Sequence, residues 1–364
     1  MGLQPSIRIL KGYRLLKPKF ARFTGLFMDI DVSPDCCIPT VGAMQGSFAA
    51  LLSVARTNSV KPYTLFIDPG FPVQKSQLHL LGLPFKSFDI LNFRGEKLHD
   101  KLESFLKEGN ICSICYSSPN NPSWICFSEK ELKTIGELAT KYDVIVIEDL
   151  AYFGMDFRQH YGIPGVSPFQ PTVASYTDNY ILLLSASKIF SYAGQRIGMM
   201  ILSESIRKRQ FPNLKNFFTS DIFGRFISYG VLYATTAGTS HSAQFALASV
   251  LKAVNDGRLD FIADLHEYGT KAKLMKALFL KYGFYIVYND EERELADGFY
   301  FTIAYPGMKS AVLMKEFLYY GISAISLAIT GSDDPNGLRA CVSFVRLDQM
   351  EVLEERLKAF VENR

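Results

Sequence analysis

The sequence lacks a strong excess of either charge. Its 364 residues include 39 lysines and arginines against 36 aspartates and glutamates, for a formal net charge of +3. A nearly neutral chain of this size gives no electrostatic reason to bind nucleic acid, so we expect no nucleic-acid partner. No apolar run reaches the roughly 18 residues that a membrane-spanning helix requires. We therefore expect no membrane partner either.

Cysteine is sparse and irregularly spaced. The six cysteines show no disulfide-framework spacing, as expected in the reducing cytoplasm. Cys112 and Cys115 form a C-x-x-C pattern, but it falls in the apolar run of residues 111–116, which is typical of a buried strand. A zinc or redox site there would need a second ligand pair or a helix start, and the sequence shows neither. We therefore predict no metal site and a cytoplasmic location.

The length of the chain predicts two domains, because single cores stop growing at about 250–300 residues. From residue 40 onward, short apolar runs alternate with helical stretches. Runs that are apolar throughout indicate strands covered on both faces, as in a parallel sheet. One helix is predicted to begin after Ser128, with Glu131 completing a capping box. The expected strands are residues 64–67, 111–116, 144–147, 180–184 and 199–202, and the expected helices between them include 48–56 and 129–142.

The pattern changes in the last third of the chain. Residues 244–282 are strongly helical, and shorter strand-like pieces follow at 299–304 and 338–344, before a final helix near 350–361. This succession indicates a second domain of the α+β type. The predicted fold class is therefore α/β, with a three-layer α/β/α large domain around a mainly parallel sheet and a smaller α+β C-terminal domain.

Three polar clusters directly follow three of the expected strands. They are residues 118–122 (SPNNP), 148–152 (EDLAY) and 185–188 (SASK), and 194–198 (GQRIG) follows the third. The carboxyl ends of parallel strands are where open α/β sheets bind their ligands. The order and placement of the clusters therefore predict one ligand site at that edge.

These clusters resemble the motifs of the class I/II aminotransferases, which are pyridoxal-5′-phosphate (PLP) enzymes of fold type I. The family pattern is N-P-x-G, then D-x-A-Y, then S-x-[SAT]-K with an arginine eight residues on. This chain shows N-P-S-W, D-L-A-Y and S-A-S-K, with Arg196 eight residues after Lys188. The resemblance covers nearly the whole chain. It implies a large PLP-binding domain over residues 35–250 and a small domain made of residues 1–34 and 251–364.

The resemblance also assigns the chemistry to particular residues. It implies that Lys188 carries PLP as a Schiff base and, once freed, moves the proton at the substrate α-carbon. PLP is an electron sink that works best with a protonated pyridine nitrogen, and a carboxylate beside that nitrogen, here Asp149, favours the charged form. Tyr152 and Asn121 would hydrogen-bond the phenolic oxygen of PLP. Glu148 would point to the other face of the sheet.

The phosphate of PLP needs positive charge and backbone donors. Arg196 offers a planar fork that matches phosphate oxygens, and Ser185 and Ser187 supply hydroxyls close by in the sequence. The resemblance implies that the amides of Ala43 and Met44 point at the phosphate from the start of a helix. That position is a natural anion site.

Two more positions follow from the resemblance. Phe71 takes the place of the aromatic residue that stacks on the pyridine ring. Arg339 resembles the arginine that clamps the substrate α-carboxylate through a bidentate pair, and Asn121 would also contact the substrate. Arg346 lies in the same strand-like region as an alternative, but the spacing favours Arg339.

The implied function is transfer of an amino group between an amino acid and a 2-oxo acid, in a homodimer whose active site lies at the subunit interface. Two alternatives remain open: a C–S β-lyase that uses the same residues, and a non-catalytic PLP-binding protein. The chain departs from the family pattern at Trp124, where the family usually has glycine, and its N-terminal segment is short. A bulky ring at residue 124 is expected to reshape the loop near the cofactor or the entrance.

Overall fold

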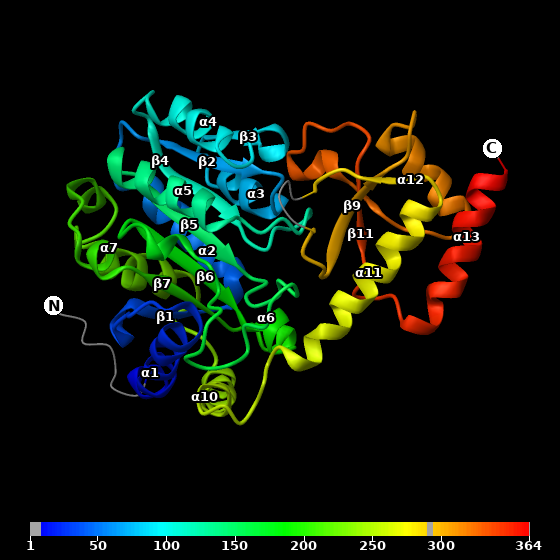
Figure 1. The fold of residues 1–364 in the computed structure, drawn as a ribbon. Helices are drawn as coiled ribbons and strands as arrows, with labels where there is room; N and C mark the ends of the chain where they lie inside the picture. The colour runs from blue at the N-terminus through cyan, green and yellow to red at the C-terminus, as the bar shows by residue number, and fades with distance from the viewer. Residues whose placement is uncertain (1–8, 290–293, 364) are drawn as a thin grey trace.

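Two β-sheets organise the chain, which this computed structural model describes over residues 9–289 and 294–363. Within those residues, the larger sheet has seven strands in the order β1-β7-β6-β5-β4-β2-β3, and the smaller has four in the order β10-β11-β9-β8. Figure 1 shows the two sheets on opposite sides of the molecule. The strands of the larger sheet are β1 (Cys37–Thr40), β2 (Tyr63–Asp68), β3 (Phe85–Asp89), β4 (Ile111–Ser117), β5 (Ile145–Leu150), β6 (Tyr180–Ser185) and β7 (Gly198–Leu202).

The larger sheet is mainly parallel, which confirms the predicted fold class. β2 pairs in parallel with β3 and β4, and β5 pairs in parallel with β4 and β6. Only β7 runs against its neighbours β6 and β1 within the described chain. β5 continues to Leu150, past the expected end at Ile147, because the carboxylates of Glu148 and Asp149 are buried and hydrogen-bonded inside the protein.

Helices cover both faces of this sheet and complete the three layers. Successive residues of a strand point to opposite faces, so Ile145 and Ile147 pack on the α2 side and Val146 on the other. The α2 side carries α2 (Gly42–Ala55), α3 (Pro72–Leu80), α7 (Glu204–Lys208), α8 (Phe223–Arg225) and the π-helical turn Phe226–Leu232. The other side carries α1 (Ile9–Met28), α4 (Lys97–Leu106), α5 (Glu129–Lys141) and α10 (His241–Asn255).

Two helices of the large domain test the local predictions. α5 begins after Ser128 with the predicted capping box, in which Ser128 and Glu131 each bond the other's backbone N–H. α2 begins at Gly42, six residues before the start expected from its apolar run but at the place where the resemblance implies the start of a helix. Its first turns, G-A-M-Q-G-S, lack apolar periodicity but pack closely, since a Cβ added at Gly46 would lie 3.2 Å from the Leu183 side chain.

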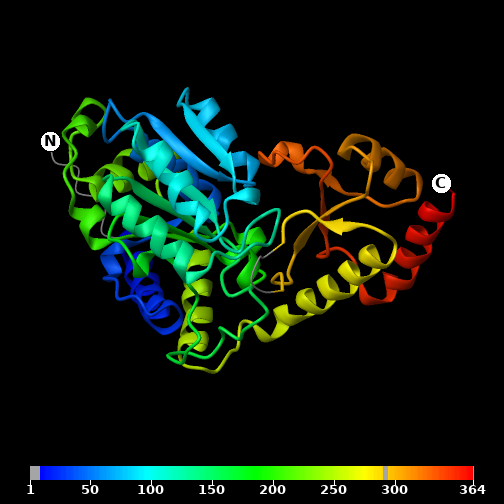
Figure 2. The same cartoon turned by 45° about the horizontal axis from the view of Figure 1, so that its top comes forward.

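The C-terminal part of the chain is a small α+β unit. Its sheet is antiparallel, and an aromatic cluster of Phe279, Phe284, Phe317 and Phe360 packs beneath it. Figure 2 shows α11 running from the large domain toward this unit. Its elements are α11 (His266–Lys281), β8 (Tyr285–Ile286), β9 (Tyr300–Ala304), α12 (Ser310–Tyr319), β10 (Ile325–Ser326), β11 (Leu338–Cys341) and α13 (Met350–Glu362).

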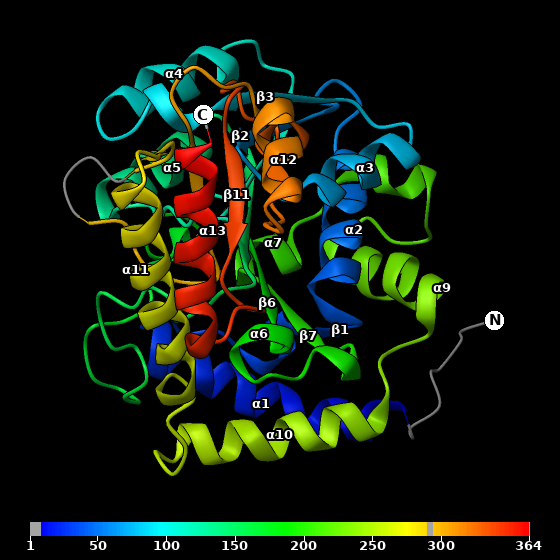
Figure 3. The ribbon, with the colours of Figure 1, turned by 90° about the vertical axis from the view of Figure 1, so that its right-hand side faces the viewer.

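The first helix lies with the large domain. α1 packs along α10 and beside β1, and Figure 3 shows the two helices side by side along one border of the molecule. The expected domain division placed residues 1–34 and 251–364 together in the small domain. For the chain as a whole, this division stays a prediction. We propose to assign α1 to the large domain, because its apolar face packs there.

The helices of residues 9–289 and 294–363 include none that is long and apolar enough to cross a membrane. The same residues contain no group of three or more histidine, cysteine, aspartate and glutamate side chains placed to hold a metal ion. All six cysteines lie in the described chain, where none forms a disulfide, and Cys341 alone is not buried.

Candidate active site

The parallel pairing brings the three polar clusters to one edge of the sheet. β4, β5 and β6 are adjacent and parallel, so their last residues, Ser117, Leu150 and Ser185, lie at the same edge. This edge faces the small C-terminal unit (Figure 1). The predicted site therefore lies between the two domains, where polar side chains from both can converge.

Two neighbouring carboxylates at the end of β5 point to opposite faces, as expected from the period of a strand. Glu148 accepts hydrogen bonds from the hydroxyls of Tyr116 and Thr172 and from the Val173 backbone N–H. Burial raises the pKa of Glu148 to about 7, against the opposing effect of these donors. Glu148 is thus fully engaged within the protein on the face away from α2.

Asp149 lies on the α2 face and has only neutral partners. Its carboxylate accepts a 2.9 Å bond from the Gln74 side chain and a 3.0 Å bond from the Ala151 backbone N–H. Burial raises the pKa of Asp149 to about 6, and the two hydrogen bonds oppose that rise. A buried carboxylate of this kind would be stabilised by a cation placed beside it.

Tyr152 follows Asp149 by three residues, just after the end of β5, and is enclosed by aromatic rings. Its ring lies 4.9 Å from the Trp124 ring and 5.7 Å from that of Phe299, between centroids. Its hydroxyl donates a long bond, 3.4 Å, to the Tyr300 hydroxyl. Burial raises the pKa of Tyr152 well above its usual range, so the phenol stays protonated and remains a hydrogen-bond donor.

Lys188 lies in a short helix that starts where β6 ends. This helix, α6 (Ala186–Ile189), is capped by Ser185, whose hydroxyl accepts a 3.2 Å bond from the Ser187 backbone N–H. The Lys188 ammonium lies 5.5 Å from the centroid of the Phe299 ring. The lysine thus faces the small domain at the same edge as Asp149.

The structure joins the two expected substrate-binding residues directly. Arg339, on β11, donates a 2.9 Å hydrogen bond from Nη1 to Oδ1 of Asn121, in the loop after β4. Its guanidinium also lies 4.3 Å over the ring of Tyr300. The alternative, Arg346, is instead exposed and paired with Asp348. The geometry therefore supports Arg339 over Arg346 as the residue facing the site.

The expected phosphate residues gather at the start of α2. A Cβ added at Gly42, whose φ is +70°, would lie only 2.7 Å from the Arg196 guanidinium, so the glycine lets that side chain approach the helix. Arg196 also donates a 3.5 Å bond to the Ser187 hydroxyl. The helix start has no side-chain cap bond, and its first turn includes Ala43 and Met44. Cation, hydroxyl and backbone donors thus lie side by side.

Phe71 occupies the residue before α3 and is half-buried. Gln74, one turn further along α3, donates to Asp149. The start of α3 is therefore held close to the expected ring-nitrogen position, and stacking by Phe71 stays a prediction.

Several residues that shape the site were not identified from the sequence. Gln74 has no motif, and its contact with Asp149 depends on where α3 packs. Phe299 and Tyr300 belong to a strand-like run that carries no chemical signal by itself.

Trp124 is the departure from the family pattern that the sequence places near the cofactor or the entrance, and the structure buries its indole completely against Tyr152. Its backbone φ of +62° is a left-handed conformation that costs roughly 1–2 kcal/mol for an L-residue.

The residues fit PLP because the described part of the chain leaves a buried carboxylate without a cation, a helix start without a side-chain cap and a guanidinium nitrogen without a hydrogen-bond partner. Asp149 is a buried carboxylate with only neutral donors, which suits a protonated ring nitrogen. The uncapped start of α2 beside Arg196 suits a phosphate. Within the described residues, the Arg339 Nε is buried without a hydrogen-bond partner, which suits a carboxylate that would complete its fork.

Comparison with known proteins identifies the family. The family profile described as aminotransferase class I and II matches residues 36–280. An aspartate aminotransferase of Pyrococcus horikoshii is 24% identical over 258 residues, which cover 70% of this chain and 61% of that protein. A probable aspartate aminotransferase of Methanocaldococcus jannaschii is 27% identical over 181 residues, or 50% of this chain and 44% of that protein. The match spans less than two thirds of either relative.

The fold has solved counterparts. The crystal structure of an aspartate aminotransferase from Thermotoga maritima aligns with a TM-score of 0.76 and 18% identity, and it covers 96% of this chain and 82% of that one. An aminotransferase structure from Mycobacterium tuberculosis aligns with a TM-score of 0.75, 16% identity and the same coverage. At this level of identity the likeness concerns the fold.

Proposed function

The chain belongs to the class I and II aminotransferase family, and from that premise we propose that it is a PLP-dependent enzyme that transfers an amino group between an amino acid and a 2-oxo acid. One observation carries the proposal. Lys188, the buried carboxylate of Asp149 and the Arg196 cradle come from three separate segments and meet at one edge of the sheet. Structural packing alone does not require this combination of a lysine, a carboxylate and an anion cradle.

Each residue of the site has its own proposed role in the reaction. PLP, when bound, supplies an electron sink for a carbanion at the substrate α-carbon. Asp149 would hold the proton on the pyridine nitrogen, while Lys188 would remove and return the proton at the substrate α-carbon. Tyr152 and Asn121 would donate hydrogen bonds to the phenolic oxygen.

Orientation of the substrate is assigned to Arg339. Its Nη1 is engaged by Asn121 while Nε is buried and unpartnered among the described residues. A substrate α-carboxylate would occupy the remaining donors as a bidentate partner. Such a clamp fixes the α-carbon relative to the ring and to Lys188, which lowers the entropic part of the barrier.

We also propose a homodimer with the active site at the subunit interface. Its support is the surface beside the phosphate cradle, where Met44 is 39% exposed. Gln45, the next residue, bonds Thr235 and Thr236 at the end of α9 (Tyr233–Thr236), and Tyr233 is itself exposed. Sedimentation of the purified protein at micromolar concentration should give the mass of two chains, and a monomer that is fully active would contradict the proposal.

The cytoplasmic location also remains a proposal. Its support is that no two of the six cysteines form a disulfide in the described chain. Fractionation of the source cells with an antibody would test it.

The cofactor attachment is tested by reduction. The purified protein should be yellow, and borohydride should fix the cofactor on the peptide that contains Lys188. Lys188→Ala is the matched control, and it should bind PLP without covalent attachment after reduction. A colourless wild-type protein with an unmodified Lys188 peptide would contradict the proposal.

The reaction class is tested by a screen of amino donors. Formation of 2-oxo acid with amino transfer to an acceptor would identify an aminotransferase, whereas release of pyruvate and ammonia from S-substituted cysteines would identify a C–S β-lyase. A protein that binds PLP and turns over neither set of substrates would favour the non-catalytic alternative.

A further inference from the structure

Trp124 is the one tryptophan of the sequence, and it is held in an unusual way. Its side chain is completely buried, and its backbone is left-handed, with a φ of +62°. A bulky residue adopts this conformation only where the surrounding structure imposes it. The contacts of the indole therefore show what the strained backbone conformation achieves.

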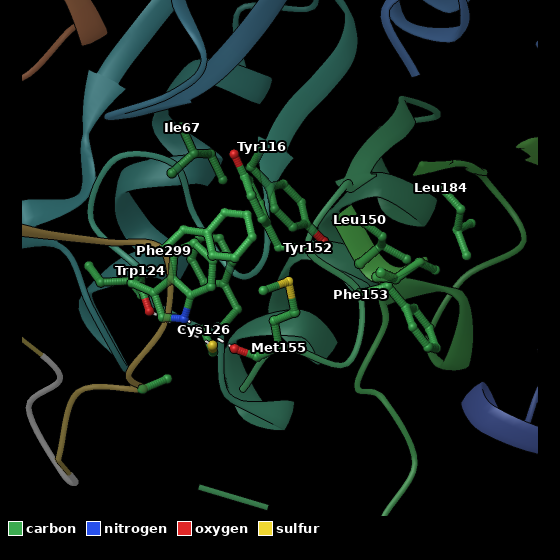
Figure 4. Packing of buried hydrophobic residues seen from close by; sticks show 14 of the residues in the cluster. Ile67, Tyr116, Trp124, Cys126, Leu150, Tyr152, Phe153, Met155, Leu184 and Phe299 are labelled. Carbon is green, nitrogen blue, oxygen red and sulfur yellow. Dashed lines mark hydrogen bonds between the residues drawn. The ribbon is translucent and has the colours of Figure 1, made fainter. Parts of the chain in front are cut away.

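Trp124 joins the two loops that carry the expected partners of the phenolic oxygen. Its Nε1 donates a 3.1 Å bond to the Met155 carbonyl, in the turn that follows Tyr152, and its ring packs 4.9 Å from the Tyr152 ring. Its backbone N–H donates a 2.8 Å bond to the carbonyl of Asn120, next to Asn121. Figure 4 shows the indole close to Phe299 and Met155 in the buried cluster that also contains Tyr152.

A glycine in the small domain makes room for this ring. A Cβ added at Gly298 would lie 1.9 Å from Cε2 and 2.1 Å from Cζ2 of the indole. No side chain other than hydrogen can occupy position 298 while the indole keeps its place. The next residue, Phe299, packs against the indole at 5.9 Å between centroids and faces the Lys188 ammonium.

We propose that Trp124 is a positioning residue that sets Tyr152 and Asn121 in place, with Gly298 as its complementary gap. The inference rests on the proposed function, because Tyr152 and Asn121 need accurate placement only if they bind the phenolic oxygen of PLP. Trp124 acts through these two residues, with its indole against Tyr152 and its main chain bonded to Asn120, and it is not itself a reacting group. It also joins the small domain to the ring-binding residues through Gly298 and Phe299.

The complementary fit between Gly298 and the Trp124 indole is tested on the cofactor-free protein, by urea unfolding of a double-mutant cycle at these two positions. Gly298→Ala should lower the unfolding midpoint in the wild-type background and leave it nearly unchanged in the Trp124→Gly background, where the added methyl group has room. Gly25→Ala is the control, since the nearest atom to an added Cβ there is 3.9 Å away, and it should not lower the midpoint. Additive effects of Gly298→Ala and Trp124→Gly would overturn the inference.

Positioning is tested on the PLP-loaded protein by a readout other than activity. Trp124→Gly should raise the pH midpoint of the bound cofactor's absorbance change by about 0.5 unit or more, because a misplaced Tyr152 stabilises the phenolate less well. It should also weaken PLP binding by about tenfold. Trp124→Phe keeps a ring beside Tyr152 without the bond to Met155. Its shift in the pH midpoint should therefore be intermediate, and it should be more stable than Trp124→Gly.

A buried aromatic outside the site separates positioning from general packing. Phe360 is also fully buried, but in the cluster of the small domain, so Phe360→Leu should reduce stability without moving the pH midpoint. Equal midpoints in Trp124→Phe, Phe360→Leu and wild type would overturn the inference. A wild-type protein that takes up no PLP would contradict the proposed function as well, whereas an additive cycle with a normal wild-type spectrum would contradict the positioning role alone.

Discussion

Two sides of the same site are built in contrasting ways. On the ring side, made by Asp149, Tyr152 and Trp124, side chains are at least nine-tenths buried, and the two aromatic rings pack against each other. On the phosphate side, made by Gly42, Ala43, Met44, Ser187 and Arg196, the helix start is open and Arg196 is exposed. The ring side belongs to the core of one chain, while the phosphate side lies at the surface.

The difference concerns how strongly each side can act on a ligand. Charges in a buried, water-poor environment interact more strongly than exposed ones, since solvent screens them less. The ring side should therefore set the chemistry, and the phosphate side should set affinity through several weaker contacts. Substitutions should follow the same order if the contrast is correct.

The largest effect is expected at the centre of the ring side. Asp149→Ala should lower kcat by at least about 100-fold, on the order of 3 kcal/mol, because the ring nitrogen would lose its buried anion. The measurement is steady-state turnover at saturating PLP, with cofactor content checked by absorbance. Unchanged turnover would remove Asp149 from its proposed role.

The same carboxylate should destabilise the cofactor-free protein at neutral pH. Its pKa in the folded protein is raised to about 6 by burial. Its contribution to the unfolding free energy is therefore favourable below the unfolded pKa near 4 and is lost as the pH rises through 6. Asp149→Asn, which cannot ionise, should therefore raise the unfolding free energy by up to about 3 kcal/mol at pH 8 and by little at pH 4. A gain that does not change between these pH values would contradict the assignment.

An intermediate effect is expected where the small domain meets the substrate. Arg339→Lys keeps the charge but loses the planar fork, so kcat/KM should fall by about 30-fold while PLP affinity changes little. Arg346→Lys is the control, because Arg346 pairs with Asp348 at the surface, and it should leave kcat/KM unchanged. Equal losses in both variants would contradict the choice of Arg339.

The smallest effect is expected on the phosphate side. Arg196→Gln should weaken PLP binding by about tenfold, since the α2 amides and nearby hydroxyls would still hold the phosphate. Equilibrium dialysis against PLP measures the change. If Arg196→Gln lost as much turnover at saturating PLP as Asp149→Ala, the contrast between the ring side and the phosphate side would be contradicted.

The site could be located from the sequence to the extent that its signals are local. The apolar runs identified five of the seven strands of the larger sheet and missed β1 and β3. The polar clusters after three of these runs identified the edge where Asn121, Asp149 and Lys188 converge. The residues Ser128 and Glu131 predicted the start of α5, because a capping box is completed within four residues. The apolar run of residues 48–56 did not reveal the first turns of α2, because those turns are specified by close packing on β6, which has no periodic signature.

What could not be predicted depends on segments distant in the chain. Gln74 reaches Asp149 across 75 positions, and Arg339 reaches Asn121 across 218. The pairing of Trp124 with Gly298 requires the loop after β4 to meet the start of β9. No local pattern encodes such meetings, because they result from how the two domains pack.

The sequence by itself determined the family, the mainly parallel sheet and the order of the motifs around Lys188, because each follows from residues close together in the chain. Only the tertiary structure decided that Arg339 contacts Asn121, that Gln74 partners Asp149 and that Trp124 is buried against Tyr152. The physical reason is that burial, and with it the raised pKa of Asp149 and the open start of α2, arises only when distant segments exclude or admit water together.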